Sequence, residues 1–409
     1  MPFALFKIQT LFSMLASTLN RRRLFHFFCL IILPGFFLPV EAKTHHVGAH
    51  QTYTTLTQAV AVTVPGDTIM IHEGNYAGGL SFLHLQGTAD KWIYIISAPS
   101  ATVIFNGGAN SWQMSDAAYV QIKGITFQQQ TGNGFNIDDG GSYSTPSHHI
   151  VFDACTFKDI KAKGNNDLLK MSGVDFFEIK NCTFLNGSAG GSGIDMVGCH
   201  EGLIKGNRFE NQGSNSIQVK GGSKNIRIEV NFFRNGGQRT LNLGGSTNLK
   251  YFRPLDARYE AAGLTVYSNI FIGSDAPIAY VGCIETEVIN NTIYLPQKWV
   301  IRILQETVDT SRFYACGNNT FKNNIVYRDS RVSIDCNIGA HTNPQSFSFS
   351  NNLWYHSQNQ AWTGPVLPVK DVNGLIGKDP LFNNAASEDF TLSRMSPAVG
   401  KGYNSTLLK

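Results

Sequence analysis

The chain repeats a short pattern in which a polar turn is flanked by apolar residues, as in IEVNFF (228–233) and VYSNIF (266–271). Successive copies are 22 to 38 residues apart. A repeat of this length, built from short strand-like segments, is typical of a solenoid. Nine copies align on one turn position, which holds Ile125, Cys155, Cys182, Asn207, Asn231, Asn269, Asn291, Asn324 and Asn352.

The residues between these turns indicate strands rather than helices. Each repeat contains two or three apolar–polar–apolar runs separated by Gly, Asn, Asp or Ser, which favour turns. Outside a short helical pattern at Thr55–Val62, no part of the mature chain keeps helical spacing over three turns. Stacked Asn side chains can bond the coils above and below, and Asn tolerates left-handed backbone angles. We therefore predict an all-β, single-stranded right-handed parallel β-helix.

Both ends of the solenoid are expected to be capped, because terminal coils expose unpaired strand edges and core side chains. We assign residues 43–110 to an N-terminal cap with the first coils, where the helical pattern covers the open end. Residues 379–409 break the repeat and are assigned to a C-terminal cap. The chain is interpreted as one elongated domain over 43–409, and the covered ends favour a monomer.

Residues 1–42 are interpreted as a signal peptide. Three arginines precede the apolar run 24–40, and Val-Glu-Ala at 40–42 fits a small-residue cleavage site. A twin-arginine signal, a start at Met14 and a retained membrane anchor are alternatives, although the run is shorter than the ~20 residues that a spanning helix prefers. We expect a secreted, periplasmic or cell-surface protein without stable membrane insertion after cleavage.

Charge excludes one class of partner. Residues 1–42 carry a net +3 of the formal +4, which leaves +1 on the mature chain. A nucleic-acid-binding protein would show a larger basic surplus, so no nucleic acid is expected. An acidic sugar chain needs only a local basic stripe.

Six of the seven cysteines lie in the mature chain. Cys155 and Cys182 share one position in successive repeats, which predicts stacked, buried thiols rather than a disulfide. Cys316 and Cys336 flank one coil, and a disulfide between them remains open in an exported protein. The absence of CxxC pairs and of His-rich spacing argues against a structural zinc site.

One predicted sheet places a polar stripe on its outer face. Strand alternation turns a set of apolar residues inward, namely Leu169, Met171, Ile194, Met196, Ile217, Val219, Leu241 and Leu243. The outward set is Lys170, Asp195, Gln218, Lys220, Asn242 and Arg302. Over six coils this stripe would extend roughly 25 Å, which suits an extended chain of sugars.

Three long loops follow strands of this sheet, at 138–149, 246–261 and 306–319. Long loops on one side of a repeat array usually form the walls of a cleft. The last two loops carry side chains suited to stacking on sugars and to holding carboxylates, namely Tyr251, Arg253, Asp256, Arg258, Tyr259, Arg312 and Tyr314.

Three segments resemble polysaccharide lyase family six, which includes chondroitinase B and alginate lyases: PGDTIMIHEGNY (65–76), GTADKWIYIISAPSATVIFNGG (87–108) and the coils SIQVKGGSKNIRIEVNFF to TLNLGG (216–245). The resemblance covers about residues 45–300. It implies cleavage of an acidic polysaccharide by β-elimination. A metal or basic residue would neutralise the uronate carboxylate, and a lysine with a nearby arginine would remove the C5 proton. The lysine of the family falls on Lys220.

The chain departs from this family at two places. Residues 213–215 are Gly-Ser-Asn where the family has calcium-binding glutamates, and Gly244 follows the TLxL strand where the family has an arginine. Calcium takes several oxygen ligands, preferably carboxylates, and Asp167, Asp195 and Asn242 are too few to assemble a site. No metal ligand and no cofactor are therefore assigned.

These observations predict an exported carbohydrate-active protein that cleaves a uronate-containing polysaccharide. The assigned catalytic residues are Lys220, Arg239 and Arg302, and the substrate-binding residues are Lys170, Asp195, Gln218, Asn242, Tyr251, Arg253 and Arg258.

Three other functions remain open. A hydrolase of the polygalacturonase type would need neighbouring carboxylates, and only Asp195 lies centrally on the stripe. An epimerase would share the first proton transfer. The main alternative is a non-catalytic glycan-binding or adhesin-like solenoid, which the two departures favour. A Lys220 covered by the 246–261 loop or paired with Asp195 would favour binding or a structural role. A Lys220 within about 5–6 Å of an arginine guanidinium in an open groove would favour catalysis.

Overall fold

The computed structural model describes residues 41–403. The predicted signal peptide lies outside the described residues, apart from its last two positions. The described residues from Ala42 onward belong to one compact unit. Within the described part of the chain, no helix has the length and apolar character needed to cross a membrane.

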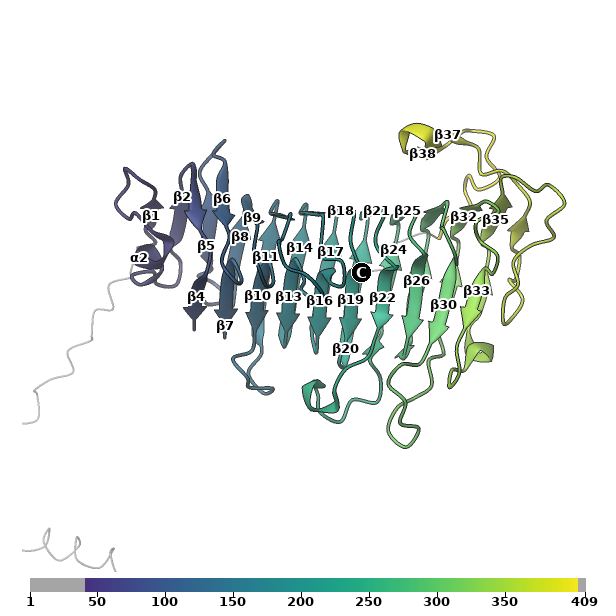
Figure 1. The fold of residues 1–409 in the computed structure, drawn as a ribbon, viewed down its shortest axis with the longest axis horizontal. Coiled ribbons are helices and arrows are strands. Elements are labelled where there is room, and N and C mark those ends of the chain that lie inside the picture. Colours follow the sequence, from purple (N-terminus) through teal and green to yellow (C-terminus); the bar gives the residue numbers. More distant parts are fainter. Residues whose placement is uncertain (1–40, 404–409) are drawn as a thin grey trace, which may run out of the picture. The chain divides into compact units, whose positions relative to one another are not determined.

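The described residues wind through three parallel sheets, which recur along the chain in the order A, B, C (Figure 1). Sheet A contains β1 (Thr44–Val47), β2 (Thr68–Ile71), β5 (Ile93–Ser97), β8 (Ala118–Lys123), β11 (Ser147–Asp153), β14 (Val174–Lys180), β17 (His200–Lys205), β20 (Ser223–Glu229), β23 (Ala261–Ala262), β24 (Thr265–Tyr267), β27 (Cys283–Ile284), β28 (Glu287–Ile289), β31 (Thr320–Lys322) and β34 (Ser348–Ser350).

Sheet B contains β3 (Gly74–Ala77), β6 (Val103–Asn106), β9 (Ile125–Gln128), β12 (Thr156–Lys158), β15 (Thr183–Leu185), β18 (Arg208–Glu210), β21 (Phe232–Arg234), β25 (Ile270–Ile272), β29 (Thr292–Tyr294), β32 (Ile325–Arg328), β35 (Leu353–His356) and β36 (Leu375–Ile376). Sheet C contains β4 (Leu80–Leu83), β7 (Trp112–Ser115), β10 (Phe135–Asp138), β13 (Leu169–Ser172), β16 (Ser192–Val197), β19 (Asn215–Lys220), β22 (Arg239–Gly244), β26 (Ala276–Val281), β30 (Ile301–Leu304) and β33 (Cys336–Ile338). The predicted parallel β-helix is confirmed.

The interior is filled by side chains stacked coil on coil. Every sheet C residue predicted to point inward, from Leu169 to Leu243, is fully buried. Sheet B contributes a column of six phenylalanine rings whose centroids lie 4.6–5.1 Å apart, made of Phe127, Phe157, Phe184, Phe209, Phe233 and Phe271. Stacked rings of this kind bury a large apolar area at each coil.

The predicted asparagine ladder is present between sheets A and B. Each ladder side chain accepts from the coil before it; for example, Asn231 N and Nδ2 donate to Asn269 Oδ1 at 2.9 and 3.0 Å. The left-handed residue of each turn is the one before the ladder position, such as Val230 (φ 57°) and Ser268 (φ 53°). The ladder is therefore explained by hydrogen bonding, since the asparagines themselves do not adopt the left-handed conformation.

The N-terminal end of the described chain carries a short helix. The helix α2 (Leu56–Val60) begins after Thr55, whose hydroxyl accepts from Gln58 N at 3.3 Å while the Gln58 side chain accepts from Thr55 N. This reciprocal arrangement satisfies two amides that have no partner inside the helix. Leu56 and Ala59 are buried in the core at this end of the solenoid (Figure 1).

The C-terminal stretch differs from its prediction. Residues 379–402 lie along the outside of sheet B, where the hairpin of β37 (Phe382–Asn384) and β38 (Asp389–Leu392) packs Phe390 against Tyr294 with 5.1 Å between ring centroids. Asn290 Oδ1 then accepts from Tyr403 N at 2.9 Å. The side chains packed on the core near the last coils, Trp362, Leu367 and Val369, come earlier in the chain.

The six cysteines of the described chain are free and buried. Cys155 and Cys182 are stacked as predicted, with Cys155 N donating to Cys182 Sγ at 3.4 Å. Burial raises the pKa of the Cys182 thiol well above its ordinary value. The disulfide between Cys316 and Cys336 that the sequence left open is not formed in this structure.

Candidate functional site

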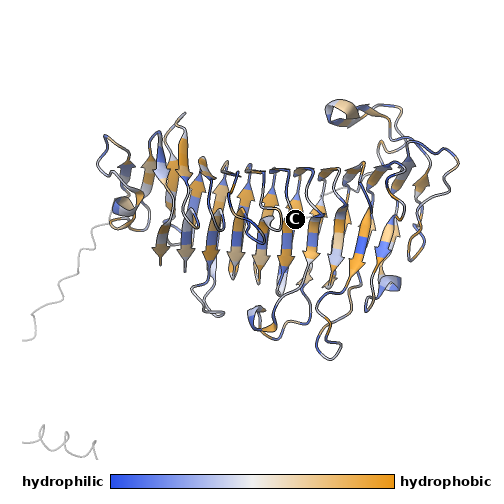
Figure 2. Ribbon diagram, viewed as in Figure 1, coloured by the Kyte–Doolittle hydropathy of each residue, from blue (hydrophilic) through white to orange (hydrophobic). Residues whose placement is uncertain are grey.

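The predicted polar stripe forms one register row across sheet C. Lys170, Asp195, Gln218 and Asn242 are successive partners in β13, β16, β19 and β22. The row continues through Ala279 to Arg302. Hydrophilic segments interrupt the apolar strands at similar heights across this sheet (Figure 2). Lys220 lies two positions further along β19, beside this row.

Asp195 lies between two lysines. Lys170 Nζ makes a short hydrogen-bonded ion pair with Asp195 Oδ2, and Lys220 Nζ lies 3.3 Å from Asp195 Oδ1. Lys220 also donates to Gln218 Oε1 at 3.3 Å. Asp195 Oδ1 is buried and has no hydrogen-bond partner. Although Asp195 points outward, these contacts leave it only 1% exposed, and it is the counter-ion of the two lysines. The substrate contact predicted for it stays a prediction.

A second carboxyl group, Asp167, lies under this pair. Its Oδ2 is 3.8 Å from Lys170 Nζ, and its Oδ1 accepts from Ser192 N at 2.8 Å. Burial raises the pKa of Asp167 to about 7, and the nearby Asp195 carboxylate adds to the rise. For Lys170, attraction to Asp195 and Asp167 outweighs the effect of burial, and the pKa is raised. Lys170 is therefore a permanent cation, and Asp167 changes its protonation near neutral pH.

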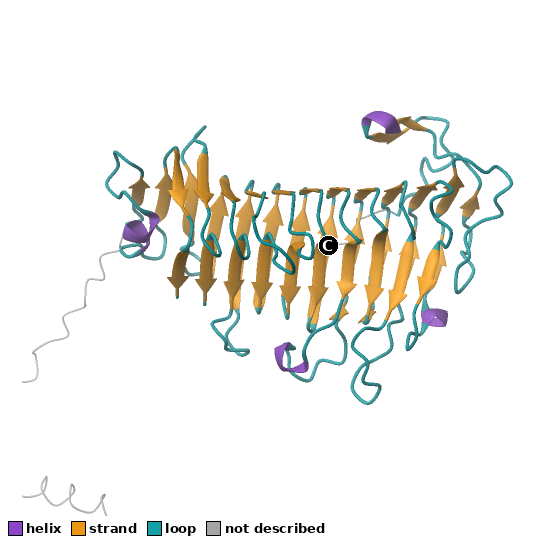
Figure 3. Ribbon diagram, in the orientation of Figure 1, coloured by secondary structure: helices purple, strands orange, loops and turns teal. Residues whose placement is uncertain are grey.

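Lys170 and Lys220 line a cleft of about 540 Å³. Its lining includes Asp138, Asp139, Tyr143, Lys170, Lys220, Asn248, Tyr251 and Arg253. Three long loops project from this edge of sheet C (Figure 3). The loops join one another, because Tyr143 Oη donates to Lys250 O and the Phe252 ring packs on Phe313 with 5.2 Å between centroids. The predicted wall of loops is thus continuous.

Arg253 anchors the 246–261 loop instead of facing solvent. Its Nη1 and Nη2 donate to Asp175 Oδ1 and Oδ2 at 2.7 and 2.6 Å, and Nη1 also donates to Gly198 O at 2.8 Å. Only 9% of Arg253 is exposed. The substrate contact predicted for Arg253 is therefore replaced by a structural role at the floor of the cleft. Asp175, which lies 78 residues earlier in the chain, had no sequence signal that pointed to this pairing.

The Arg253–Asp175 pair gives the loop a specific pH dependence. Burial alone would raise the pKa of Asp175, but hydrogen bonds from Arg253 and His200 outweigh it and lower the pKa to about 2. A carboxyl group with a lowered pKa contributes stability above its ordinary pKa near 4 and loses it as the pH falls towards 2. The shift corresponds to about 2 kcal/mol.

We expect Asp175→Asn to remove this contribution. In urea unfolding at pH 5, the variant should be less stable than the wild type, and the difference should shrink towards pH 2 because the wild-type carboxylate is then protonated. Asp153→Asn is the control, since its partner Lys123 is 53% exposed and exposed pairs contribute little. A difference between Asp175→Asn and wild type that stays constant from pH 5 to pH 2 would contradict this assignment.

The other predicted arginines occupy different positions. Arg239 Nη1 donates to Asn242 Oδ1 at 3.2 Å and its Nη2 lies 2.7 Å from Glu306 Oε1. Arg239 is the register partner of Asn215, at the start of the strand that ends at Lys220, and it is not part of the cleft lining. Arg258 is exposed and lies over the Tyr314 ring, 4.3 Å from its centroid, outside the cleft lining, and the substrate contact predicted for it is not supported by this position.

The sequence analysis missed two carboxylates in the cleft. Asp138 and Asp139 line it together with the lysines. Burial raises the pKa of Asp139, and the adjacent Asp138 carboxylate contributes to the rise. Their position at the end of a sheet C strand, in the loop already predicted to border the cleft, was the signal that could have identified them.

One glycine in each of the two departures from the resembling family is closely packed against the backbone of a neighbouring coil. A Cβ atom at Gly244 would lie 1.7 Å from Val281 O, and one at Gly213 would lie 2.1 Å from Ser188 O. An arginine or a glutamate therefore cannot replace these glycines without movement of the backbone. Within residues 41–403 there is also no group of three His, Cys, Asp or Glu side chains suited to a metal ion. The Asp195 carboxylate is held by ammonium groups, so these residues do not fit a calcium site.

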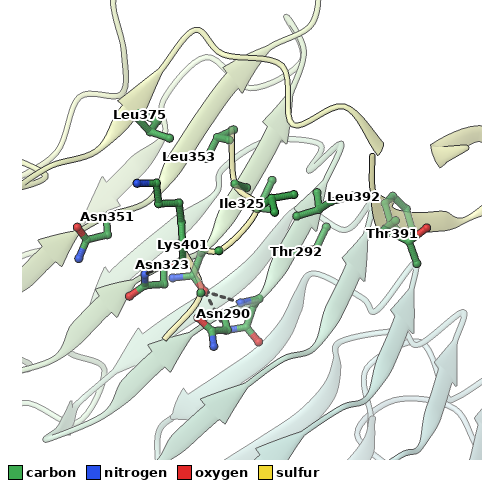
Figure 4. Close-up of a pocket in the computed structure, with 17 residues that line it drawn as sticks. Asn290, Thr292, Asn323, Ile325, Asn351, Leu353, Leu375, Thr391, Leu392 and Lys401 are labelled. Atoms are coloured by element: carbon green, nitrogen blue, oxygen red, sulfur yellow. Dashed lines mark hydrogen bonds between the residues drawn. The ribbon is translucent and has the colours of Figure 1, made fainter. Parts of the chain in front are cut away.

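A second cavity, of about 580 Å³, lies between sheet B and residues 390–402 (Figure 4). The residues that line it include Ile325, Leu353 and Leu375. An asparagine of the lining already has a hydrogen-bond partner in the C-terminal segment, since Asn323 Nδ2 donates to Lys401 O at 2.6 Å. Its lining includes no carboxylate and one lysine. The cleft on sheet C is therefore the better candidate for a chemical site.

Comparisons with known proteins agree with the fold. Residues 107–293 match the family model described as the right handed beta helix region. The solved structure of pectate lyase Pel9A superimposes with a TM-score of 0.50 at 13% identity, over 90% of this chain and 92% of that one. This similarity shows a right-handed parallel β-helix and nothing about the reaction.

Two further solved structures are less similar. An alginate lyase from Paenibacillus sp. str. FPU-7 has a TM-score of 0.49 at 17% identity, over 82% of this chain and 99% of that one. The surface adhesin PfbA of Streptococcus pneumoniae has a TM-score of 0.45 at 12% identity, over 77% and 89% of the two chains. No curated protein matches the sequence.

Proposed function

We propose that the protein is an exported carbohydrate-active enzyme that cleaves a uronate-containing polysaccharide by β-elimination in the cleft on sheet C. One observation carries the proposal: Lys220 lines an open cleft of about 540 Å³ together with Tyr143, Tyr251 and Arg253. The resemblance of the 216–245 coils to polysaccharide lyase family six, and the existence of pectate and alginate lyases with similar folds, support the same chemistry. Secretion and a monomeric state belong to the proposal.

In this reaction the neutral Lys220 amine takes the C5 proton of a uronate. The electron pair of the C5–H bond forms the C4–C5 double bond, and the C4–O bond breaks. The leaving glycosidic oxygen takes a proton from the Lys220 ammonium group. Arg239 stabilises the charge that develops on the uronate carboxylate, because a prepositioned guanidinium is strongest where negative charge grows.

The pairing of Lys220 with Asp195 must be reconciled with a role as base. Lys170 makes the hydrogen-bonded contact with Asp195, whereas the contact of Lys220 with Asp195 is an ion pair without a hydrogen bond. Lys170 therefore neutralises most of the Asp195 charge. Lys220 therefore lines the cleft without a hydrogen bond to Asp195.

The test follows the ultraviolet absorbance of the unsaturated product when the mature chain is incubated with a panel of acidic polysaccharides, with and without a metal chelator. Lys220→Met is expected to lower the rate by about 10²–10⁴, the usual contribution of a general base. The control is Lys205→Met, which removes a lysine from sheet A. Equal rates for Lys220→Met and the wild type would reject Lys220 as the base.

Hydrolysis is the second candidate, and the two carboxyl groups in the cleft favour it. Asp138 and Asp139 line the cleft, and burial raises the pKa of Asp139, the direction that suits a general acid. Hydrolysis would produce new reducing ends without the ultraviolet product. Binding of the same polysaccharides without either product would indicate the non-catalytic alternative.

A further inference from the structure

A second cationic position lies on sheet C, three coils from the cleft towards the C-terminal end. The register row passes from Gln218 through Asn242 and Ala279 to Arg302. At about 4.8 Å per coil, Arg302 lies roughly 14 Å along the axis from Gln218, the residue that accepts the Lys220 hydrogen bond. This distance is too large for Arg302 to act on the same sugar as Lys220, so its predicted catalytic role is replaced.

Arg302 is held in place but is not neutralised. Its guanidinium carbon lies 4.3 Å from the Trp299 ring centroid, and its Nε donates to Asn337 Oδ1 at 3.0 Å. No carboxylate among residues 41–403 forms an ion pair with it. Its remaining N–H groups have no recorded acceptor in the described chain, and a guanidinium offers them in a geometry that matches carboxylates and sulfates.

The charged groups around Arg302 also favour the binding of an anion there. Burial lowers the pKa of Arg302, and repulsion from Arg239 lowers it further, against smaller opposite effects of Glu306 and Asp275. Glu306 pairs with Arg239, and no carboxylate of the described chain forms an ion pair with Arg302. An anion placed at Arg302 would remove the repulsion, and the partly buried setting makes that attraction stronger than it would be in water.

The groove is also asymmetric in charge along its axis. On the N-terminal side of the cleft, Asp138 Oδ2 accepts from Gln113 and Asn136 at 2.7 and 3.2 Å, which leaves an acidic, hydrogen-bonded surface. On the C-terminal side lie Arg239 and Arg302. A sugar chain with a negative charge on successive units is repelled on the first side and attracted on the second.

We propose that Arg302 and Trp299 form a distal subsite for a second anionic sugar substituent, so that a polyanionic sugar chain extends from the Lys220 cleft towards the C-terminal coils. Trp299 positions the Arg302 guanidinium, and Lys298 Nζ, 4.2 Å from the same ring centroid, adds a second cation beside it. The inference rests on the proposed function for the nature of the ligand. It adds the direction of the chain and a minimum length of several sugars.

The test is calorimetric binding of uronate oligomers, from disaccharide to hexasaccharide, to the mature chain. Arg302→Gln is expected to weaken hexasaccharide binding about tenfold, which is about 1.4 kcal/mol, and to leave disaccharide binding unchanged. Arg302→Lys should retain part of the hexasaccharide affinity, and added salt should reduce the difference between variant and wild type. Arg208→Gln is the matched control, since Arg208 also lies over an aromatic ring, 4.4 Å from the Phe232 centroid, but on sheet B.

The outcomes separate the two proposals. Wild-type affinity of Arg302→Gln for every oligomer length would overturn the distal subsite and leave the proposed lyase reaction untouched. An equal loss at all lengths would overturn it too, because Arg302 would then act at the first sugar or through folding. The same length dependence with sulfated oligomers only would keep the subsite and identify the anion as a sulfate ester. A wild type that binds no anionic oligomer would reject both proposals.

Discussion

Replacing Phe209 with alanine is expected to lower the free energy of unfolding by about 3–5 kcal/mol, the usual cost of emptying a buried aromatic site. Phe209 is fully buried, and its ring lies between those of Phe184 and Phe233, with centroids 4.6 and 4.9 Å away. The coils above and below are held by the same column of rings, so the cavity cannot collapse without moving neighbouring strands. Equilibrium urea unfolding, followed by far-ultraviolet circular dichroism, measures the loss.

Two variants control this prediction. Phe209→Leu keeps most of the buried volume and should cost clearly less than the alanine variant. Phe176→Ala removes a phenylalanine that is 53% exposed, and exposed positions usually change stability by less than about 0.5 kcal/mol. Equal stabilities of Phe209→Ala and Phe176→Ala would show that the phenylalanine column does not hold the coils together.

A comparable loss is expected when the asparagine ladder is broken at its centre. Asn269 Oδ1 accepts from Asn231 N and Nδ2, and its Nδ2 donates to Ile228 O at 2.8 Å. Asn269→Leu leaves these buried groups without partners, at about 1–3 kcal/mol for each. We expect a total loss of at least about 3 kcal/mol, with faster amide exchange in the flanking turns as a local readout.

An exposed asparagine ladder on the same solenoid provides the control. Asn211 Nδ2 donates to Asn186 Oδ1 at 3.2 Å at an exposed site, and Asn211 has a φ of 52°. Asn211→Gly removes the side chain without backbone strain, since glycine accepts this conformation. Water replaces the lost partner there, so the change in stability should be small. If Asn269→Leu were as mild as Asn211→Gly, burial would not be the source of the ladder's contribution.

The repeat in the sequence was sufficient to predict the fold because each coil needs the same residue types at the same turn and strand positions. The ladder asparagines recur once per coil, and strand alternation separates Leu169 and Met171, which are fully buried, from the outward Lys170 between them. Parallel stacking then brings equivalent residues of successive coils into register. The order Lys170, Asp195, Gln218, Asn242 follows from that register alone.

The chemistry of the cleft depends on side-chain contacts that do not recur from one coil to the next, so the repeat does not predict them. Which lysine holds Asp195, and which arginine remains without a counter-ion, is decided by side chains that reach across coils and from the loops. Arg253 looked like an exposed loop arginine, but the loop folds over the sheet and inserts it beside Asp175. Arg302 points outward as predicted. The catalytic role predicted for it is replaced by a proposed binding role, because three coils separate Arg302 from Gln218.

The sequence by itself determined the solenoid, its hydrogen-bonded asparagine ladder, the polar face of sheet C and the side on which the long loops lie. Each of these features follows from the residue type at a fixed position in the repeat. The residues of one coil and of the next are therefore enough to predict it. The tertiary structure alone decided the ion-pair partners, the inclusion of Asp138 and Asp139 in the cleft, and the path of residues 379–402 along sheet B. These depend on loops and a terminal segment outside the repeat, whose positions are set by long-range packing.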